Sequence, residues 1–321
     1  MPEKLDISVV IPAYNEEESI TELHDWISLV MKKHDFIYEI LVIDDGSTDA
    51  TWAKIVELSS TNSNLKGLKY NRNHGKSAAL NTGFQFASGD VVITMDADLQ
   101  DSPDEIPDLY KMIKEDGFDL VSGWKKKRHD PIGKTIPSKF FNFVTSKISG
   151  IRLHDFNCGL KAYKNVVVKN INVYGEMHRY IPVICKWHGF ANIGEKVVQH
   201  QARKYGVTKF GLERFITGFL DLISVTFVSK FRKKPMHFFG TLGSLSFFAG
   251  FFITIYILFQ KVWSIYNDLV FRDAVDQPLF YLALVAIIIG VQLFLAGFLA
   301  EMYTMANEKN SQYLVIEKVG I

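Results

Sequence analysis

The amino-acid sequence predicts an α/β domain with a doubly wound, mostly parallel sheet, followed by interfacial helices and a two-helix transmembrane hairpin. Two observations carry this prediction. Short, continuously apolar runs alternate with segments of helical periodicity in the N-terminal part, which is typical of a parallel sheet covered on both faces. Two apolar stretches in the last third are each long enough to cross a bilayer as a helix.

Four strands are expected in order along the N-terminal part. Residues 7–11 (ISVVI) form the first, which Pro12 should end, and residues 39–43 (EILVI) form the second. Residues 65–70 form a weaker third strand, and residues 91–95 form the fourth. The first, second and fourth runs are mostly apolar rather than alternating, as expected for strands buried on both faces.

Helical segments separate these strands. After the acidic residues 16–18, apolar side chains at positions 23, 27 and 30 share one helical face, and a second such pattern starts at Trp52. Residues 76–87 form a third helical segment. In a sheet wound in this way, ligands bind beyond the carboxyl ends of the strands.

Two long apolar segments predict membrane-spanning helices. Residues 236–262 carry no charge before Lys261, and residues 278–300 carry none. A pair of buried helices in a soluble core is the alternative, although such helices normally have a polar face. The basic run KFRKK at 230–234 should stay in the cytoplasm, so both termini are expected there, joined by a multi-pass hairpin in the inner (cytoplasmic) membrane.

These patterns predict four parts of the chain. They are a cytoplasmic domain at 1–210, amphipathic juxtamembrane helices at 211–235, two transmembrane helices within 236–304 (236–262 and 278–302), and a cytoplasmic tail at 305–321. The tail has strand character at 312–318 (QYLVIEK), which suggests a homo-oligomer such as a tetramer.

Composition excludes several classes of protein. The 36 basic and 35 acidic residues nearly cancel, so no nucleic-acid partner is expected. Cys158 and Cys185 are the only cysteines, which is neither a disulfide framework nor a zinc ligand set and favours a reducing compartment. No cleavable signal peptide is expected at the start of the sequence.

Polar clusters follow all four predicted strands. They are 12–16 (PAYNE), 44–47 (DDGS), 71–76 (NRNHGK) and 96–98 (DAD). An isolated Asp-x-Asp is more often a turn or helix cap, and Asp101-Ser102-Pro103 fits the start of a helix. Four clusters at one edge of the sheet indicate a binding site instead.

The residue types in these clusters suit a nucleotide diphosphate held through a metal. Asp96 and Asp98 offer the carboxylate oxygens that Mg²⁺ or Mn²⁺ prefers. Tyr14 can face a base, and Asp45 can accept a hydrogen bond from a base or ribose. Gly75 lets the backbone approach closely while Lys76 supplies charge; the sequence has no Gly-x-Gly-x-x-Gly or Walker motif.

Together these motifs resemble the inverting family 2 glycosyltransferases with the GT-A fold. The resemblance continues through SGWKKKRHDP (122–131), PSKFFNF (137–143), HDFNCGLKAY (154–163), GEMHRYIP (175–182) and QHQARKYGVTKFG (199–211). This longer set is similar to the polyprenol-phosphate glycosyltransferases, relatives of dolichol-phosphate mannosyltransferase, in the bacterial form with two C-terminal transmembrane helices.

The resemblance implies a role for each matching residue. It places the metal on Asp96, Asp98 and Gln100, and it makes Asp98, Asp155 and Arg128 catalytic. The residues implied to bind the nucleotide sugar are Pro12, Ala13, Tyr14, Glu16, Asp45, Gly75, Lys76, Asp96, Ala97 and Asp98. Those implied to face the acceptor phosphate are Lys125, Arg128, Ser138, Lys139, Arg179 and Arg203, where Lys125 and Lys139 replace the arginines of many relatives.

The implied activity is metal-dependent sugar transfer with inversion. The donor would be a nucleotide diphosphate sugar of glucose, N-acetylglucosamine or mannose type, a UDP-sugar rather than a GDP-sugar. The acceptor would be undecaprenyl or another polyprenyl phosphate at the cytoplasmic membrane face. A processive polysaccharide synthase is the first alternative, but it should carry a Gln-x-x-Arg-Trp motif and more spans. The second is a catalytically dead, nucleotide-binding membrane scaffold.

Overall fold

A computed structural model describes the chain at residues 4–126, 142–147, 149–175, 177–201, 204, 235–269 and 273–307. These residues belong to two compact units, one within residues 1–226 and one within 227–321. Residues 211–234 of the juxtamembrane segment predicted at 211–235, and the strand predicted at 312–318, lie outside the described residues.

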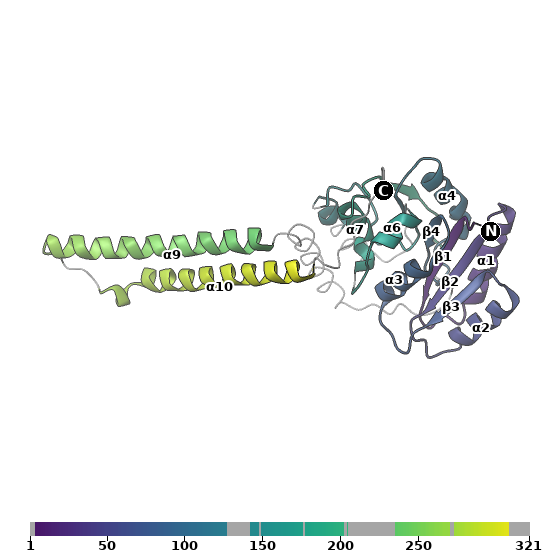
Figure 1. Cartoon of the computed structure of the whole chain (residues 1–321), viewed down its shortest axis with the longest axis horizontal. Helices are drawn as coiled ribbons and strands as arrows, with labels where there is room; N and C mark the ends of the chain where they lie inside the picture. The colour runs from purple at the N-terminus through teal and green to yellow at the C-terminus, as the bar shows by residue number, and fades with distance from the viewer. Residues whose placement is uncertain are drawn as a thin grey trace, which may run out of the picture. The chain divides into compact units, whose positions relative to one another are not determined.

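The N-terminal unit is built on one seven-stranded sheet (Figure 1). Its strands, in the spatial order β3-β2-β1-β4-β6-β5-β7, are β1 (Ile7–Ala13), β2 (Tyr38–Asp44), β3 (Leu65–Lys69), β4 (Val91–Thr94), β5 (Leu120–Trp124), β6 (Lys161–Lys164) and β7 (Ile193–Val197). Its helices in the described part of the chain include α1 (Ile20–Lys33), α2 (Thr51–Thr61), α3 (Lys76–Phe86), α4 (Ile106–Lys114), α6 (Asn165–Asn170) and α7 (Ile181–Trp187), with short 3-10 turns at Pro103–Glu105 and Met177–Tyr180. Residues 142–147 are also helical.

The pairing confirms the predicted mostly parallel sheet. Strand β1 runs parallel to β2 and β4, and β2 runs parallel to β3. Only β6 is antiparallel to its neighbours β4 and β5, while β5 and β7 are again parallel. Parallel strands require crossover connections, and the helices α1, α2 and α3 supply them for β1 to β4.

The first strand is longer than the sequence predicts. It continues through Pro12 to Ala13, whose partners on β2 are Ile43 and Asp44. Pairing of β1 with β4 stops at Val10 and Thr94, so Pro12 lies where β1 has lost one of its neighbours. A residue without a backbone N–H is tolerated at such a position.

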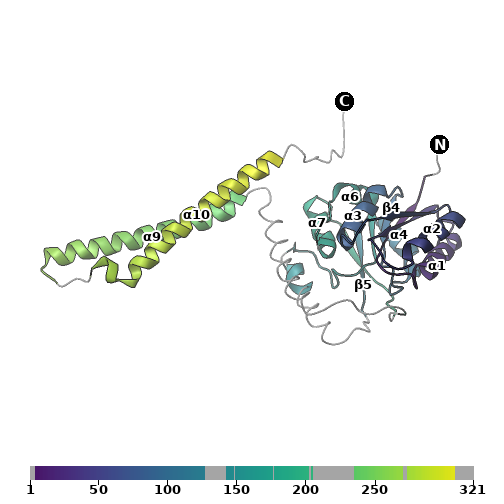
Figure 2. The same ribbon diagram turned by 90° about the horizontal axis from the view of Figure 1, so that it is seen from below.

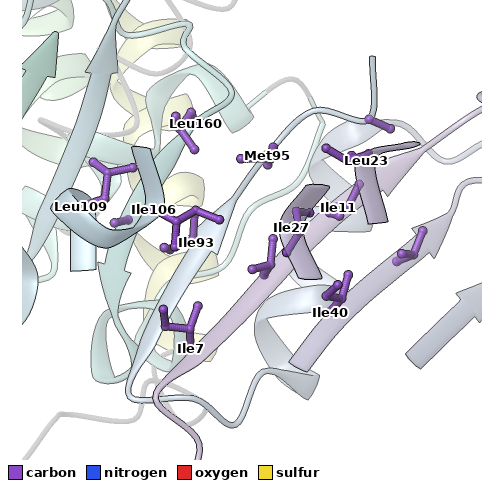
Figure 3. Close-up of a cluster of buried hydrophobic side chains, with 14 of the residues drawn as sticks. Ile7, Ile11, Leu23, Ile27, Ile40, Ile93, Met95, Ile106, Leu109 and Leu160 are labelled. Atoms are coloured by element: carbon purple, nitrogen blue, oxygen red, sulfur yellow. The ribbon is translucent and has the colours of Figure 1, made fainter. Parts of the chain in front are cut away.

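Alternate side chains of the central strands pack into two apolar layers. Ile7, Val9 and Ile11 of β1 contribute to a cluster with α1, α2 and α4, whereas Val10 contributes to a cluster with α3, α6 and α7. Figure 2 shows these two groups of helices apart from each other. Figure 3 shows the first layer, in which side chains of α1 and α4 meet those of the strands. Burial on both faces explains the continuous apolar runs.

A buried carboxylate joins the amino ends of these strands. Glu39 of β2 is 1% exposed and accepts hydrogen bonds from Ser8 Oγ at 2.6 Å, Ser88 N at 2.7 Å and Lys66 Nζ at 2.6 Å. Burial alone would raise the pKa of Glu39, but the hydrogen bonds from Lys66, Ser8 and Ser88 outweigh it and lower the pKa below its ordinary value.

Glu39→Gln is therefore expected to lower the free energy of unfolding at neutral pH by about 1.5–3 kcal/mol, the range for hydrogen bonds to a charged group. Because the pKa of Glu39 is lower in the folded state, its stabilisation is present above the ordinary pKa of 4.5 and is lost as pH falls below it. The difference between wild type and variant should shrink on acidification in denaturant melts. The exposed Glu57→Gln is the control and should show no such difference.

The C-terminal unit consists of two long apolar helices, α9 (Pro235–Tyr266) and α10 (Pro278–Asn307), with a 3-10 turn at Ala274–Asp276. Their apolar windows have mean hydropathies of 2.0 and 2.6, and both helices are long enough to cross a membrane. Glycines let their backbones approach: a Cβ on Gly290 would lie 2.6 Å from Phe247 N, and one on Gly250 would lie 2.6 Å from Ala283 O. Small residues at the contact are typical of packed membrane helices.

Candidate active site

The carboxyl ends of the first four strands meet at one edge of the sheet. Ala13 pairs with Asp44, and Asp44 pairs with Lys69, so the ends of β1, β2 and β3 are level. Strand β4 ends beside β1 at Thr94. The structure thus brings the polar clusters that follow these strands to the same edge, as the sequence predicts.

The loops after β1 and β2 are held together by hydrogen bonds. Asn15 N donates to Ser47 Oγ at 2.9 Å, and Thr48 N donates to Asn15 Oδ1 at 2.8 Å. Glu16 N donates to Thr51 Oγ1 at 2.8 Å. Asn15 has a positive φ of 54°, a conformation that asparagine tolerates better than most residues. Tyr14 and Glu16 therefore belong to a loop of fixed shape, which follows Pro12 and Ala13 at the end of β1.

Asp45 orders the loop that follows β3. It is 4% exposed, and its Oδ1 and Oδ2 accept hydrogen bonds from His74 N at 2.7 Å and Gly75 N at 2.9 Å. Gly75 has a φ of +91°, which favours glycine. The sequence predicts Asp45 as a nucleoside contact, which stays a prediction. The structure shows that it also positions Gly75 and hence Lys76.

Lys76, the first residue of α3, forms an ion pair with Asp96 beyond β4. Burial alone would raise the pKa of Asp96, but the charges of Lys76 and Lys125 and the hydrogen bond from Lys76 lower it to about 2. Asp96 is therefore a carboxylate at any physiological pH. The side chains of both residues are about one-third exposed, at 31% and 32%.

Gly159, which precedes β6, lies directly against the same carboxylate. A Cβ on Gly159 would lie 2.5 Å from Asp96 Oδ2 and 2.6 Å from its Cγ. Thr94 Oγ1 donates to the Gly159 carbonyl at 2.8 Å and fixes this approach. Lys161, two residues on, is 3% exposed and hydrogen-bonds the Cys158 carbonyl. Gly159 and Lys161 are not among the predicted site residues, although both lie in the motif HDFNCGLKAY.

Gly159→Ala is expected to displace the Asp96 carboxylate and to lower the transfer activity that the sequence predicts by about tenfold to a hundredfold, since misplacements of about 1 Å cost up to this much. Initial rates and Mn²⁺ affinity measure the effect. Gly123→Ala is the matched control because its Cβ would meet Cys158 Sγ at 2.7 Å instead of Asp96. Equal losses of Mn²⁺ affinity in both variants would contradict a specific role for Gly159.

Asp98 lies in a turn beyond β4. It is 9% exposed, and its Oδ1 accepts a hydrogen bond from Gln100 N at 3.2 Å. Leu99 between them has a positive φ of 61°. The Gln100 carbonyl accepts from Gln201 N at 2.9 Å, so the turn is tied to the chain after β7.

The donor set fits a hard divalent cation. Within the described part of the chain, no three His, Cys, Asp or Glu side chains are grouped to hold a metal, so two carboxylates would need other oxygens to complete a shell. Mg²⁺ is held in this way, by one or two carboxylates with waters and substrate phosphates.

The predicted acceptor residue Lys125 is engaged in a buried ion pair. Its Nζ lies 2.9 Å from Asp101 Oδ1, and the Asp101 side chain is fully buried. Burial alone would lower the pKa of Lys125, but the charges of Asp101 and other nearby groups, Asp96 among them, together with the hydrogen bond to Asp101, outweigh it and raise the pKa above its ordinary value. Asp101, predicted at a helix start, directly precedes Ser102, whose Oγ caps the 3-10 turn at Asp104 N.

Two other predicted site residues, Asp155 and Arg179, are buried. Asp155 is 1% exposed and accepts from Asn157 N at 3.0 Å, while Arg179 is 7% exposed. The neighbouring His178 pairs with Ser77 through Nδ1 at 3.1 Å. Burial first, and then the charge of Lys76, lower the pKa of His178 well below its ordinary value. His178 is thus a neutral ring in contact with α3.

The remaining predicted site residues lie outside the described part of the chain. They are Arg128, Ser138, Lys139 and Arg203. Their proposed contacts with the acceptor phosphate stay predictions.

Comparisons with known proteins agree with this fold. The model of glycosyl transferase family 2 matches residues 8–171. Dodecaprenyl-phosphate galacturonate synthase of Rhizobium johnstonii is 35% identical over 94% of this chain and 88% of its own. Undecaprenyl-phosphate 4-deoxy-4-formamido-L-arabinose transferase of Shewanella sediminis is 34% identical over 92% and 86%.

Solved structures share the fold at lower identity. Glucosyl-3-phosphoglycerate synthase of Mycobacterium tuberculosis, in complex with UDP, has a TM-score of 0.54 and 22% identity over 70% of this chain and 80% of its own. Mannosyl-3-phosphoglycerate synthase of Rubrobacter xylanophilus has a TM-score of 0.56 and 18% identity over 71% and 75%. The N-terminal unit thus has a GT-A-like fold, and the chain belongs to glycosyltransferase family 2.

Proposed function

We propose that this protein transfers a sugar from a nucleotide diphosphate sugar to a polyprenyl phosphate such as undecaprenyl phosphate, with inversion and dependence on Mg²⁺ or Mn²⁺. The observation that carries the proposal is the convergence of the Tyr14 loop, Asp45, Lys76 and the Asp96–Asp98 pair at one sheet edge in a chain that also has two membrane-length helices. The two named relatives act on polyprenyl phosphates.

The acidic pair fits a role toward the donor diphosphate. Asp96, Asp98 and Gln100 would hold the divalent cation, which would neutralise the leaving diphosphate when bound. A related structure of glucosyl-3-phosphoglycerate synthase contains Mn²⁺ and UDP. The low pKa of Asp96 keeps this ligand deprotonated. The fixed loops at Asn15 and Asp45 would orient the nucleoside, and Lys76 would add positive charge near the diphosphate.

The reaction needs little help from a general base. The acceptor phosphate is already anionic, so one of its oxygens can form the new bond to the anomeric carbon directly. The bond from that carbon to the diphosphate oxygen breaks on the opposite face, and its electron pair leaves with the nucleoside diphosphate. Positive side chains must hold the acceptor against repulsion from the donor. The buried Arg179 and the predicted residues Lys125, Arg128, Ser138, Lys139 and Arg203 are the candidates.

A lipid acceptor would explain the two long apolar helices of the C-terminal unit, because the acceptor lies in a membrane. We infer that α9 and α10 cross the inner membrane with both termini in the cytoplasm, following the basic run at 230–234. The domain bounds at 1–210, 211–235, 236–304 and 305–321, and a homo-oligomer, belong to the same proposal. Protease added to sealed right-side-out cells should spare the N-terminal domain, and cleavage there would contradict this topology.

A donor panel tests the proposal. Purified protein and undecaprenyl phosphate are incubated with UDP-glucose, UDP-N-acetylglucosamine and GDP-mannose, with and without Mg²⁺ or Mn²⁺, and lipid products are identified by mass. The relatives' names add two sugars, galacturonate and 4-deoxy-4-formamido-L-arabinose, which are supplied to the panel as nucleotide sugars. One sugar added per lipid, only with metal, is the expected result. A polymer would support a processive synthase, and binding without transfer would support a scaffold.

A further inference from the structure

The negative charge of the Asp96 carboxylate is balanced by a lysine of the chain itself. The Lys76 ammonium forms an ion pair with Asp96 Oδ1, which is one of the oxygens that a divalent cation would use. An ammonium and a divalent cation held against the same carboxylate repel each other at short range. The metal therefore binds Asp96 at lower cost when Lys76 moves away.

We propose that Lys76 is the resident counter-ion of Asp96 and is transferred to the donor diphosphate when nucleotide and metal bind together. The inference rests on the proposed function, because it assumes a nucleotide diphosphate as the ligand. Lys76 thereby makes metal binding conditional on the nucleotide.

Lys76 is the ammonium best able to move. Lys125 and Lys161 also act on Asp96 through their charges, but Lys125 is 2.9 Å from the fully buried Asp101, and Lys161 is 3% exposed and bonded to the Cys158 carbonyl. The Lys76 side chain is 31% exposed. It stands on a long flexible stem, while its backbone is fixed through the bond from Gly75 N to Asp45.

Local charge explains why the two ligands should bind together. A divalent cation alone would have to displace Lys76 and then sit near positive Lys76, Lys125 and Lys161. A diphosphate supplies negative oxygens that accept the released ammonium and complete the metal shell. Binding of each ligand therefore favours the other, and this coupling is reciprocal.

The experiment measures Mn²⁺ binding by electron paramagnetic resonance in wild type and Lys76→Met, with no nucleotide and with UDP. In the variant, Mn²⁺ alone should bind about fivefold or more tightly than in wild type, since typical couplings start near this value. UDP in the presence of Mn²⁺ should bind about fivefold or more weakly, measured by calorimetry, because the diphosphate loses its ammonium partner. A merely structural lysine would weaken both.

Lys114→Met is the matched control because Lys114 also pairs with an aspartate, Asp90, at 2.8 Å, and lies outside the site. It should leave both affinities unchanged. Lys76→Gln repeats the test if Lys76→Met does not fold. Unchanged or weaker binding of Mn²⁺ alone in both Lys76 variants overturns the inference, even if sugar transfer is observed. Absence of transfer from every donor overturns the proposed function, even if the opposite shifts of Mn²⁺ and UDP are found.

Discussion

Asp98→Asn is expected to lower the rate of sugar transfer by about 10²–10³-fold while leaving the melting temperature unchanged. A metal ligand contributes several kcal/mol to stabilising a leaving diphosphate, and each 1.4 kcal/mol is about a tenfold change in rate. Asparagine keeps an Oδ1 atom that can accept the 3.2 Å bond from Gln100 N, so the turn should persist. The measurement is the initial rate at saturating donor and lipid phosphate, with the optimal metal.

Asp116→Asn is the control. It removes the same charge from the protein, and Asp116 is an exposed residue beyond α4. It should transfer sugar at the wild-type rate. Raising the Mn²⁺ concentration should recover part of the Asp98→Asn activity if the lost function is metal binding. Full activity of Asp98→Asn at limiting Mn²⁺ would remove Asp98 from the metal site.

The strand ends could be predicted because they depend on local sequence. Apolar runs locate β1, β2 and β4, and the rule that parallel strands share a carboxyl edge places Asp45 and Asp96 at the same edge without any knowledge of contacts. The apolar segments likewise predict α9 and α10, which extend a few residues beyond the predicted ends. Their crossing of a membrane stays a prediction.

Contacts between distant segments could not be predicted in the same way. Gly159 reaches Asp96 because β6 is inserted antiparallel between β4 and β5, and no local pattern marks that insertion. The bonds from His74 N and Gly75 N to Asp45 depend on the shape of an irregular loop. Pro12 does not end β1 as the sequence predicts, because the effect of a proline depends on whether both neighbouring strands are paired at its position.

Breaking the Asp101–Lys125 pair should produce the largest loss of stability. Asp101→Asn leaves the Lys125 ammonium without its charge partner at a side-chain exposure of only 14%. Removing one member of a buried ion pair costs about 3–5 kcal/mol, and for a domain of this size that lowers the melting temperature by about 6–20 °C. Lys125→Met should have a similar effect. Melting is followed by tryptophan fluorescence of the full chain in detergent.

The double variant Asp101→Asn/Lys125→Met tests whether the two side chains act as a pair. With both charges removed, no uncompensated charge is buried, so its loss of stability should be smaller than the sum of the single losses. The same variants decide the role of Lys125. If Lys125→Met melts like the wild type but raises the KM for lipid phosphate, Lys125 contacts the acceptor. If Lys125→Met melts at a lower temperature but has an unchanged KM for lipid phosphate in assays below that temperature, Lys125 instead stabilises the turn that carries Asp96 and Asp98.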